Sequence, residues 1–499
     1  MKSKILLLLL LLFALFAVLF AVPKWMERRE EQILPSATGT AESPAETMEE
    51  SSFPYETAWA ESGTETESAP FEEEDPGEPV EREKIQTDIM FASDIHYLSP
   101  KLTDYGNAFA EMAGNDDGKV EKYMTQIWQA FAEEVISARP DALVLSGDLT
   151  LDGEKVNHQE LAARLAEIEA NGIPVLVIPG NHDINNPHAA AYFGEEETEA
   201  ETVTPEEFRE IYRPYGYEEA VSYAPDSMSY LYRLNDTTWM MMLDTCIYEP
   251  ENRVYGDIKP KTLTWMEECL KEAYAQGITV IPVGHHNLQE LSRVYVEECV
   301  LENHEEVIRV LEKYLTPVYM SGHLHVQRIL KHLREPGVGD DVYGIWEIVS
   351  NSLIIPPCQY GTLSCAPDGT FAYHTHNVNV SSWAAKHGET NVDLLDFPAF
   401  SDEYLRMIVR QQAYEEIDGI PDELREELAD FYAELYRDYY AGRLINYKER
   451  QKERGYQLWD RFMNPSMQFR QVEGMMKDGM AVNNNAEIPN PLHLTRPWL

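Results

Sequence analysis

Five short polar segments, each placed directly after an apolar run, constrain the fold of this 499-residue chain more than any other feature. The apolar runs are about five residues long and rich in Ile, Val, Met and Leu, which is typical of strands buried on both faces of a parallel sheet. The carboxyl ends of such strands form the ligand crevice of an open α/β sheet. We therefore expect the polar segments to meet at one sheet edge. The expected strands are 88–92, 142–146, 174–178, 278–283 and 317–321.

The residue types in these segments indicate metal binding. Imidazole nitrogen, carboxylate oxygen and amide oxygen, with no cysteine among them, suit first-row ions such as zinc, manganese and iron. Two ions about 3.5–4 Å apart, sharing a bridging carboxylate, would use this many donors and are the usual device for hydrolysing phosphate esters. The segments are Asp94-Ile95-His96, Gly147-Asp148, Gly180-Asn181-His182-Asp183, Gly284-His285-His286 and Gly322-His323-Leu324-His325.

These blocks, in this order, resemble the calcineurin-like metallophosphoesterase family, whose pattern is D-x-H, G-D, G-N-H-D/E, a lone H and G-H-x-H. The resemblance implies a cofactor of two divalent or mixed-valence transition-metal ions, Mn, Fe or Zn. It also implies that Asp148 bridges the two ions. The remaining implied ligands are Asp94, His96 and His325 for one ion, and Asn181, His285 and His323 for the other.

The resemblance also implies the catalytic residues. The family assigns the histidine at the position of His182 to the leaving-group oxygen of the substrate, as a proton donor. Asp183 would orient the ring of His182 or raise its pKa through a charge pair. Purple acid phosphatases carry a tyrosine ligand of iron three residues after the bridging aspartate, whereas this chain has Leu151 there. A purple di-iron centre is therefore not expected.

Three further residues are candidates for contacts with the substrate. Tyr97 follows the first block, His286 follows the lone histidine ligand, and Tyr360 lies in a segment rich in proline and glycine. For His286 the alternative is a packing role. For the two tyrosines the alternative is an ordinary place in an exposed loop.

The first 26 residues predict a signal peptide or an N-terminal membrane anchor. Two lysines precede the eighteen uncharged residues 5–22. This run is longer than the signal-peptide core of about 7–15 residues and just reaches spanning length. Leu19 is bulky for the third position before a cleavage after Ala21, so we favour an anchor, with a secreted form as the alternative. Either way the enzyme is expected outside the cytoplasm.

Composition separates the next segment and excludes one class of ligand. Residues 27–84 are rich in Glu, Ser, Thr and Pro without a sustained period, which predicts an acidic disordered linker. The formal net charge of −47 argues against a nucleic-acid polymer as partner, because such polymers are bound through Lys and Arg. The expected partners are a small phosphoester and, through the N-terminal segment, a membrane.

Alternating strand and helix patterns predict an α/β catalytic domain over residues 85–379, with helices near 120–138, 154–171 and 261–276. The family resemblance implies a two-sheet α/β/β/α sandwich. Residues 380–499 contain polar-aromatic helical stretches and predict an additional C-terminal α-helical domain. This region resembles the C-terminal helical domain of secreted bacterial cyclic nucleotide phosphodiesterases.

The expected function is that of a metal-dependent phosphoesterase which hydrolyses a phosphodiester, with a cyclic nucleotide as the first candidate, by attack of a metal-bridging hydroxide. The alternative among enzymes is a phosphomonoesterase or a lipid or cell-wall phosphoesterase. The alternative from another class is an extracellular metal-binding scaffold without turnover. The intact Asn181-His182-Asp183 block argues against the scaffold, because a protein without turnover does not need the acid histidine.

Overall fold

The computed structural model describes residues 76–295, 298–334 and 341–496 of the chain. The segment Pro76–Leu499 forms one compact unit. The predicted anchor at 1–26 and the predicted linker up to residue 75 lie outside the described residues. No helix within the described ranges is both long enough and apolar enough to span a bilayer.

The first sheet has six strands in the order β15-β14-β13-β1-β2-β3. Strands β1, β2 and β3 run parallel, as their apolar runs predict, and β13 pairs antiparallel with β1. The strands are β1 (Thr87–Ala92), β2 (Ala142–Ser146), β3 (Val175–Ile178), β13 (Gln359–Cys365), β14 (Phe371–Asn377) and β15 (Asn485–Ile488).

The second sheet has seven strands in the order β11-β12-β10-β9-β8-β7-β6. Its central strands β8, β9, β10 and β12 are parallel. The strands β11 and β7 pair antiparallel with β12 and β8, and the edge strand β6 pairs antiparallel with β7. The strands are β6 (Ser222–Tyr223), β7 (Tyr230–Arg233), β8 (Thr238–Met242), β9 (Thr279–Val283), β10 (Val318–Ser321), β11 (Arg328–Lys331) and β12 (Trp346–Val349). A separate hairpin joins β4 (Ala190–Phe193) to β5 (Glu196–Glu199).

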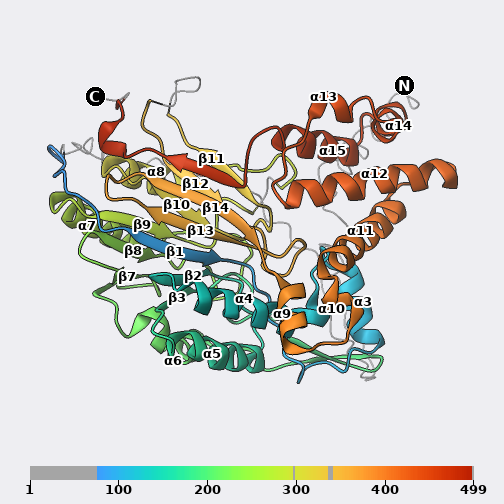
Figure 1. Cartoon of the computed structure of the whole chain (residues 1–499), viewed down its shortest axis with the longest axis horizontal. Helices are drawn as coiled ribbons and strands as arrows, with labels where there is room; N and C mark the ends of the chain where they lie inside the picture. Colours follow the sequence, from blue (N-terminus) through green and yellow to red (C-terminus); the bar gives the residue numbers. More distant parts are fainter. Residues whose placement is uncertain (1–75, 296–297, 335–340, 497–499) are drawn as a thin grey trace, which may run out of the picture. The chain divides into compact units, whose positions relative to one another are not determined.

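The two sheets pack face to face between helices, which confirms the predicted α/β/β/α sandwich (Figure 1). Successive residues of β8 show the alternation of a strand buried on both faces. Met240 lies in the core cluster shared with the first sheet, whereas Met241 lies in the cluster formed with the helices outside the second sheet. The covering helices are α4 (Met124–Ala138), α5 (Lys155–Glu169), α6 (Pro205–Ile211), α7 (Pro260–Ala275) and α8 (His304–Lys313).

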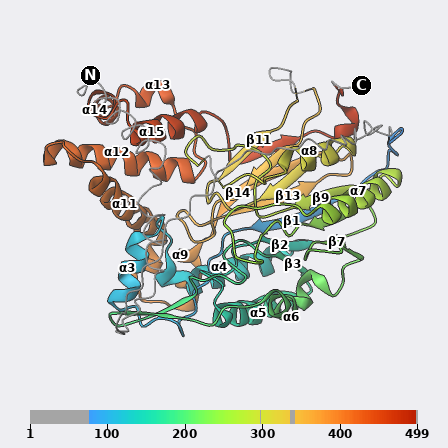
Figure 2. The same ribbon diagram turned by 180° about the vertical axis from the view of Figure 1, so that it is seen from behind.

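The C-terminal helices gather at one end of the sheets, as Figures 1 and 2 show from opposite sides. Their core is shared with the catalytic sandwich, because Phe431, Trp459 and Met476 belong to the same cluster as Val326 and Val349. A short helix, α3 (Asn107–Asn115), precedes the loop that leads to α4. The C-terminal helices are α9 (Val380–His387), α10 (Val392–Leu395), α11 (Phe397–Glu416), α12 (Asp422–Tyr440), α13 (Tyr447–Arg450), α14 (Arg454–Phe462) and α15 (Met467–Asp478).

Two segments differ from the predicted organisation. The part of 380–499 after α15 is not helical throughout, because it contains β15, which pairs with β14 and so extends the first sheet. The end of the predicted linker lies against the catalytic sandwich. There the Lys84 side chain donates to the Gly277 carbonyl at 2.7 Å, and the Lys84 N–H donates to the Pro367 carbonyl at 2.9 Å.

Candidate metal centre

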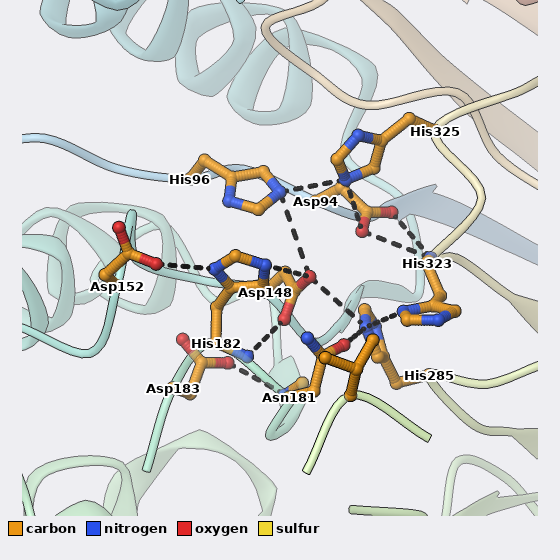
Figure 3. Close-up of polar contacts among 12 residues, drawn as sticks. Asp94, His96, Asp148, Asp152, Asn181, His182, Asp183, His285, His323 and His325 are labelled. Atoms are coloured by element: carbon orange, nitrogen blue, oxygen red, sulfur yellow. Dashed lines mark hydrogen bonds and ion pairs between the residues drawn. The ribbon is translucent and has the colours of Figure 1, made fainter. Parts of the chain in front are cut away.

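The five polar blocks converge from two sheets rather than from one, which corrects the expectation of a single sheet edge. Each block follows the carboxyl end of a parallel strand: β1, β2 and β3 in the first sheet, and β9 and β10 in the second. The predicted ligands therefore face one another across the sandwich (Figure 3). The first sheet contributes Asp94, His96, Asp148 and Asn181, and the second contributes His285, His323 and His325.

The first group of candidate ligands has its donor atoms within 4.8 Å of one another and consists of Asp94, His96, Asp148 and His325. The Nε2 atoms of His96 and His325 are 3.0 Å apart, and His325 Nε2 is 3.3 Å from Asp94 Oδ1. Donor atoms around one ion with bonds of about 2.0–2.2 Å lie about 3 Å apart, so this spacing fits a coordinated cation. Two imidazole nitrogens this close also need a proton or a cation between their lone pairs.

The second group shares Asp148 with the first and adds His285 and His323. His285 Nε2 lies 3.3 Å from Asp148 Oδ2, 3.3 Å from His323 Nδ1 and 3.1 Å from Asn181 Oδ1. Membership of both groups places the Asp148 carboxylate between two cation positions. The structure thus brings all seven predicted metal ligands together in the arrangement that the family resemblance implies.

Acceptors outside the centre set the orientation of three of the histidine rings. His285 Nδ1 donates to the Ser146 carbonyl at 2.8 Å, and His323 Nε2 donates to the Glu298 carbonyl at 3.1 Å. His325 Nδ1 donates to Asp117 Oδ2 at 2.6 Å. A ring nitrogen that donates outward leaves the lone pair of the other nitrogen directed at the centre, which is the arrangement that metal-binding histidines use.

Burial and neighbouring charges shift the pKa values of the histidines in the centre in opposite directions. Burial and the nearby Lys119 lower the pKa of His96 well below its ordinary value. Burial and the neighbouring His285 lower the pKa of His323 to about 3. Burial alone would raise the pKa of Asp148, but His285 and His182 hold that pKa well below its usual range. His96 and His323 therefore favour the neutral form. Burial also opposes protonation of His285 and His325, but Asp148 raises the pKa of His285 and Asp117 raises the pKa of His325 to about 10, so an arriving cation has to displace protons from these two rings.

Five of the seven candidate ligands adopt left-handed backbone conformations, which residues other than glycine rarely adopt. The φ angles are 52° for Asp94, 43° for His96, 46° for Asp148, 70° for His323 and 55° for His325. Such conformations cluster at functional sites, because only a surrounding structure that fixes them can maintain them. Unusual backbone conformations thus coincide with most of the candidate ligands, although Asn181 and His285 do not share them.

The glycines of the polar blocks are needed mainly because atoms of the neighbouring chain lie too close for a side chain, and less because of unusual backbone angles. Of those that precede a ligand, only Gly147 has a positive φ, at 91°. A Cβ atom on Gly180 would lie 2.1 Å from the Asp148 backbone nitrogen, and one on Gly322 would lie 1.8 Å from Ser93 Oγ. At Gly180 and Gly322 the neighbouring chain therefore leaves no room for a side chain.

His182 stands beside the centre with its ring held by Asp152. His182 Nδ1 is 2.9 Å from Asp152 Oδ1, and its Nε2 is 4.0 Å from Asp148 Oδ2. Its side chain is 27% exposed, whereas that of Asp148 is 2% exposed, so His182 is open to an incoming ligand. Burial opposes protonation of His182, but the charges of Asp148 and Asp152 outweigh it and raise the pKa to about 9. A protonated imidazole next to two cation positions can bind an anion and release a proton to it.

Asp183 does not have the role that the sequence assigned to it. Its carboxylate accepts from the backbone N–H groups of Leu149, Thr150 and Gly180 at 3.1, 3.0 and 2.8 Å. It therefore braces the loop that carries Asp148, and Asp152 takes the expected position against His182. The sequence contained a signal for this residue, because Asp152 is an acidic residue four positions after the bridging aspartate. Spacing alone could not rank it above Asp183, which is adjacent to His182.

Two of the predicted substrate contacts have the environment of packed residues. Tyr97 is 0% exposed, and its hydroxyl donates to Glu160 at 3.0 Å and accepts from Arg164 at 2.7 Å. Tyr360 is buried and stacks on His376 with the ring centroids 5.3 Å apart. The structure therefore favours structural roles for both tyrosines.

His286 is also satisfied within the protein. Its Nδ1 lies 2.8 Å from Thr245 Oγ1, and its Nε2 donates to the Val254 carbonyl at 2.8 Å. Its ring centroid is 4.5 Å from that of His323. These contacts favour the packing alternative, in which His286 supports the ligand His323 instead of touching the substrate.

Comparison with known proteins agrees with this geometry. Residues 87–327 match the family model of the calcineurin-like phosphoesterases, and residues 379–481 match the model of the C-terminal domain of cyclic nucleotide phosphodiesterase. No curated protein matches the chain in sequence.

Similar solved structures include two phosphatases. One is a dimetal phosphatase from Danio rerio, with 14% identity over 58% of this chain and 96% of that chain and a TM-score of 0.43. The other is the purple acid phosphatase PPD1 from yellow lupin (Lupinus luteus) seeds, with 13% identity over 59% of this chain and 52% of that chain and a TM-score of 0.40.

Proposed function

We propose that this chain, which carries a calcineurin-like phosphoesterase domain followed by a cyclic nucleotide phosphodiesterase C-terminal domain, hydrolyses a small phosphodiester. The family match and the paired ligand groups support the broader class, in which the chain is a metal-dependent phosphoric ester hydrolase. The finer assignment to diesters rests on one observation, the match of residues 379–481. A cyclic nucleotide is the first candidate substrate.

The chain's own residues fit two divalent ions. Asp94, His96 and His325 would hold one ion, Asn181, His285 and His323 the other, and Asp148 both. When bound, such ions neutralise phosphate charge and lower the pKa of a water molecule so that it can act as a nucleophile. We further propose Mn, Fe or Zn, because the donor set contains nitrogen and oxygen but no thiolate.

His182 supplies the proton that the leaving group needs. Its Nε2 faces the centre, and Asp152 fixes the opposite ring nitrogen at 2.9 Å. Breaking a P–O ester bond leaves an alkoxide, which is a poor leaving group unless it is protonated as the bond breaks. With a pKa of about 9, His182 carries this proton at neutral pH.

The test compares diesters with monoesters on the purified full-length chain in the presence of added Mn²⁺. We expect a higher kcat/KM for bis(p-nitrophenyl) phosphate than for p-nitrophenyl phosphate, and hydrolysis of 3′,5′-cyclic nucleotides to the monoester without further release of phosphate. The variant Asp148→Asn, purified in the same way, controls for contaminating phosphatases, because it removes the carboxylate shared by both ligand groups.

The opposite preference would favour a phosphomonoesterase, and inactivity on both synthetic esters and on cyclic nucleotides would favour a lipid or cell-wall phosphoester. Full metal content without turnover on any of these esters would point to the scaffold alternative.

A further inference from the structure

The loop between α3 and α4 contacts the candidate metal ligand His325 through Asp117. His325 Nδ1 donates to Asp117 Oδ2 at 2.6 Å, and the other oxygen of Asp117 accepts from Lys119 Nζ at 2.8 Å. Lys119 is 5% exposed and also donates to Asp116 at 2.7 Å. The Asp117 carboxylate is therefore fixed between an imidazole and a buried ammonium group.

The C-terminal helices hold this loop in place. Gln412 on α11 donates from Nε2 to the carbonyls of Asp116 at 2.8 Å and Gly114 at 3.3 Å. Gly118 has a φ of 93°, and a Cβ atom there would lie 2.4 Å from Cδ1 of Leu405, a fully buried residue of α11. The loop thus packs against α11 so closely that a side chain at position 118 has no room.

The same helices also hold the chain just after His325. The Gln327 N–H donates to the carbonyl of Tyr440, the last residue of α12, at 3.0 Å. Arg328 is buried and donates from Nη1 to the carbonyl of Asp478, the last residue of α15, at 2.6 Å. His325 is thus fixed through its ring by Asp117 and through its backbone by the C-terminal helices. In Figure 3 the His325 ring lies at the rim of the ligand cluster.

We propose that the C-terminal helical domain positions the metal ion of Asp94, His96 and His325, and that it acts through the positioning residue Asp117. A carboxylate that accepts from Nδ1–H keeps the His325 ring in one tautomer and directs the Nε2 lone pair at the ion. Within the described residues, neither ligand group draws a member from 379–481, so the domain acts on the ion indirectly, through the loop that carries Asp117 and through the backbone that follows His325. The inference needs the metal centre but not the preference for phosphodiesters.

The experiment measures metal affinity in the full-length chain, apart from turnover. Apo-protein is titrated with Mn²⁺, and free Mn²⁺ is followed by electron paramagnetic resonance. Asp117→Ala should weaken one of the two ions by about 10–100-fold and leave the other unchanged, since outer partners of ligands typically have effects of this size. Asp117→Asn should lose less metal affinity than Asp117→Ala, because its amide oxygen still accepts a hydrogen bond from His325 Nδ1–H. Gln412→Ala should weaken the same ion about fivefold, the usual effect of one hydrogen bond.

Gln411→Ala is the matched control. Gln411 is the neighbour of Gln412 on α11, it is exposed, and it donates within its own helix to Glu415. Its variant should bind both ions as the wild type does. The proposal is overturned if Asp117→Asn and Gln412→Ala keep wild-type affinity for both ions, or if Gln411→Ala weakens the ion as much as Gln412→Ala. These milder variants decide the matter even if Asp117→Ala does not fold. A wild-type chain that binds fewer than two ions would overturn the two-metal centre and this inference with it.

Discussion

At the scale of single residues, His182 shows how neighbouring charges select a role. Burial would remove the proton from this imidazole, whereas the carboxylates of Asp148 and Asp152 retain it. Because Asp152 contacts Nδ1, the proton that faces the centre is the one on Nε2. This geometry supports the proposed role of His182 as a proton donor and not as a further metal ligand.

His182→Ala should leave the metal content nearly unchanged and slow turnover by about 10²–10⁴, the usual effect of losing a general acid. The loss should be smaller for a nitrophenyl ester than for an alkyl ester, because nitrophenolate leaves without protonation. Rates on the two esters with matched metal analysis measure this. Equal losses on both would contradict the acid role.

Asp152→Asn should change the pH profile of the enzyme. The proposed acid role requires the protonated form of His182, so wild-type activity should fall as the pH rises through about 9. The variant removes one of the charges that raise this pKa, so its alkaline limb should move to lower pH. Profiles of kcat/KM from pH 6 to 10 test the shift. An unchanged alkaline limb would mean that another group controls it.

That the seven candidate ligands lie close together could be predicted because they match the motifs of the family resemblance and each block is contiguous with the strand that positions it. The partner of His182 could not. Asp183 is adjacent in sequence, but its side chain turns back to the backbone N–H groups of Leu149 and Thr150. The role of Asp117 was equally hidden, since 208 residues separate it from His325. Contacts of this kind depend on tertiary packing, which local pattern does not encode.

At the scale of strands and loops, Glu347 joins three elements of the second sheet. It lies on β12 at 0% exposure, and its carboxylate accepts from Leu288 N–H at 2.8 Å, after β9, and from Ser321 Oγ at 3.1 Å, on β10. Burial raises the pKa of Glu347 to about 8, although these hydrogen bonds act in the opposite direction. The folded protein therefore keeps a proton on Glu347 at pH values at which Glu347 of the unfolded chain has already lost it.

Glu347→Gln should make stability less dependent on pH. The folded-state pKa is above the unfolded value, so the stability that this proton provides is present at low pH and is lost between about pH 4.5 and 8. The Tm of the variant minus the Tm of wild type should therefore be larger at pH 8 than at pH 5. The exposed Glu487 on β15 gives a matched control, Glu487→Gln, for which no such difference is expected. A Tm difference for Glu347→Gln that is equal at both pH values would contradict this account.

The strands could be predicted from their apolar runs, but the neighbours with which they pair could not always be predicted. The hairpin of β13 and β14 follows from turn signals around Asp368 and Gly369. The strand β15 has no comparable local signal, because it is four residues long and pairs with β14 more than a hundred residues earlier in the chain. The attachment of Lys84 to Gly277 is similarly long-range. Contacts between segments so far apart in the sequence form only when the whole core packs.

At the scale of the whole molecule, each cation position draws ligands from both sheets, so bound ions would join the two halves of the sandwich. Chelation should therefore lower the Tm, and free Mn²⁺ about 100-fold above its Kd should add about 2.7 kcal/mol to the free energy of unfolding. Calorimetry with EDTA and with graded Mn²⁺ measures this, and Asp148→Asn should respond more weakly. A Tm that is independent of Mn²⁺ would argue against ions that bridge the sheets.

We propose that residues 1–26 anchor the protein in a membrane with the catalytic unit outside the cytoplasm. The uncharged run 5–22 supports this, and the unit Pro76–Leu499 is compact by itself. Fractionation should find the full chain with membranes, and deletion of residues 1–75 should leave hydrolysis of a soluble ester unchanged. Recovery from the medium with an amino terminus near Val22 would instead indicate a cleaved signal peptide.

The left-handed backbone of the five ligands has a consequence for how long each copy of the protein survives. Each such residue costs about 1–2 kcal/mol, and in an empty protein no bonds to an ion offset this cost. Empty copies then open more often than loaded ones, and open copies are the ones that proteases cut. Proteolysis would therefore remove the inactive members of the population first. The amount of enzyme that persists, and not only its activity, would follow the supply of metal around it.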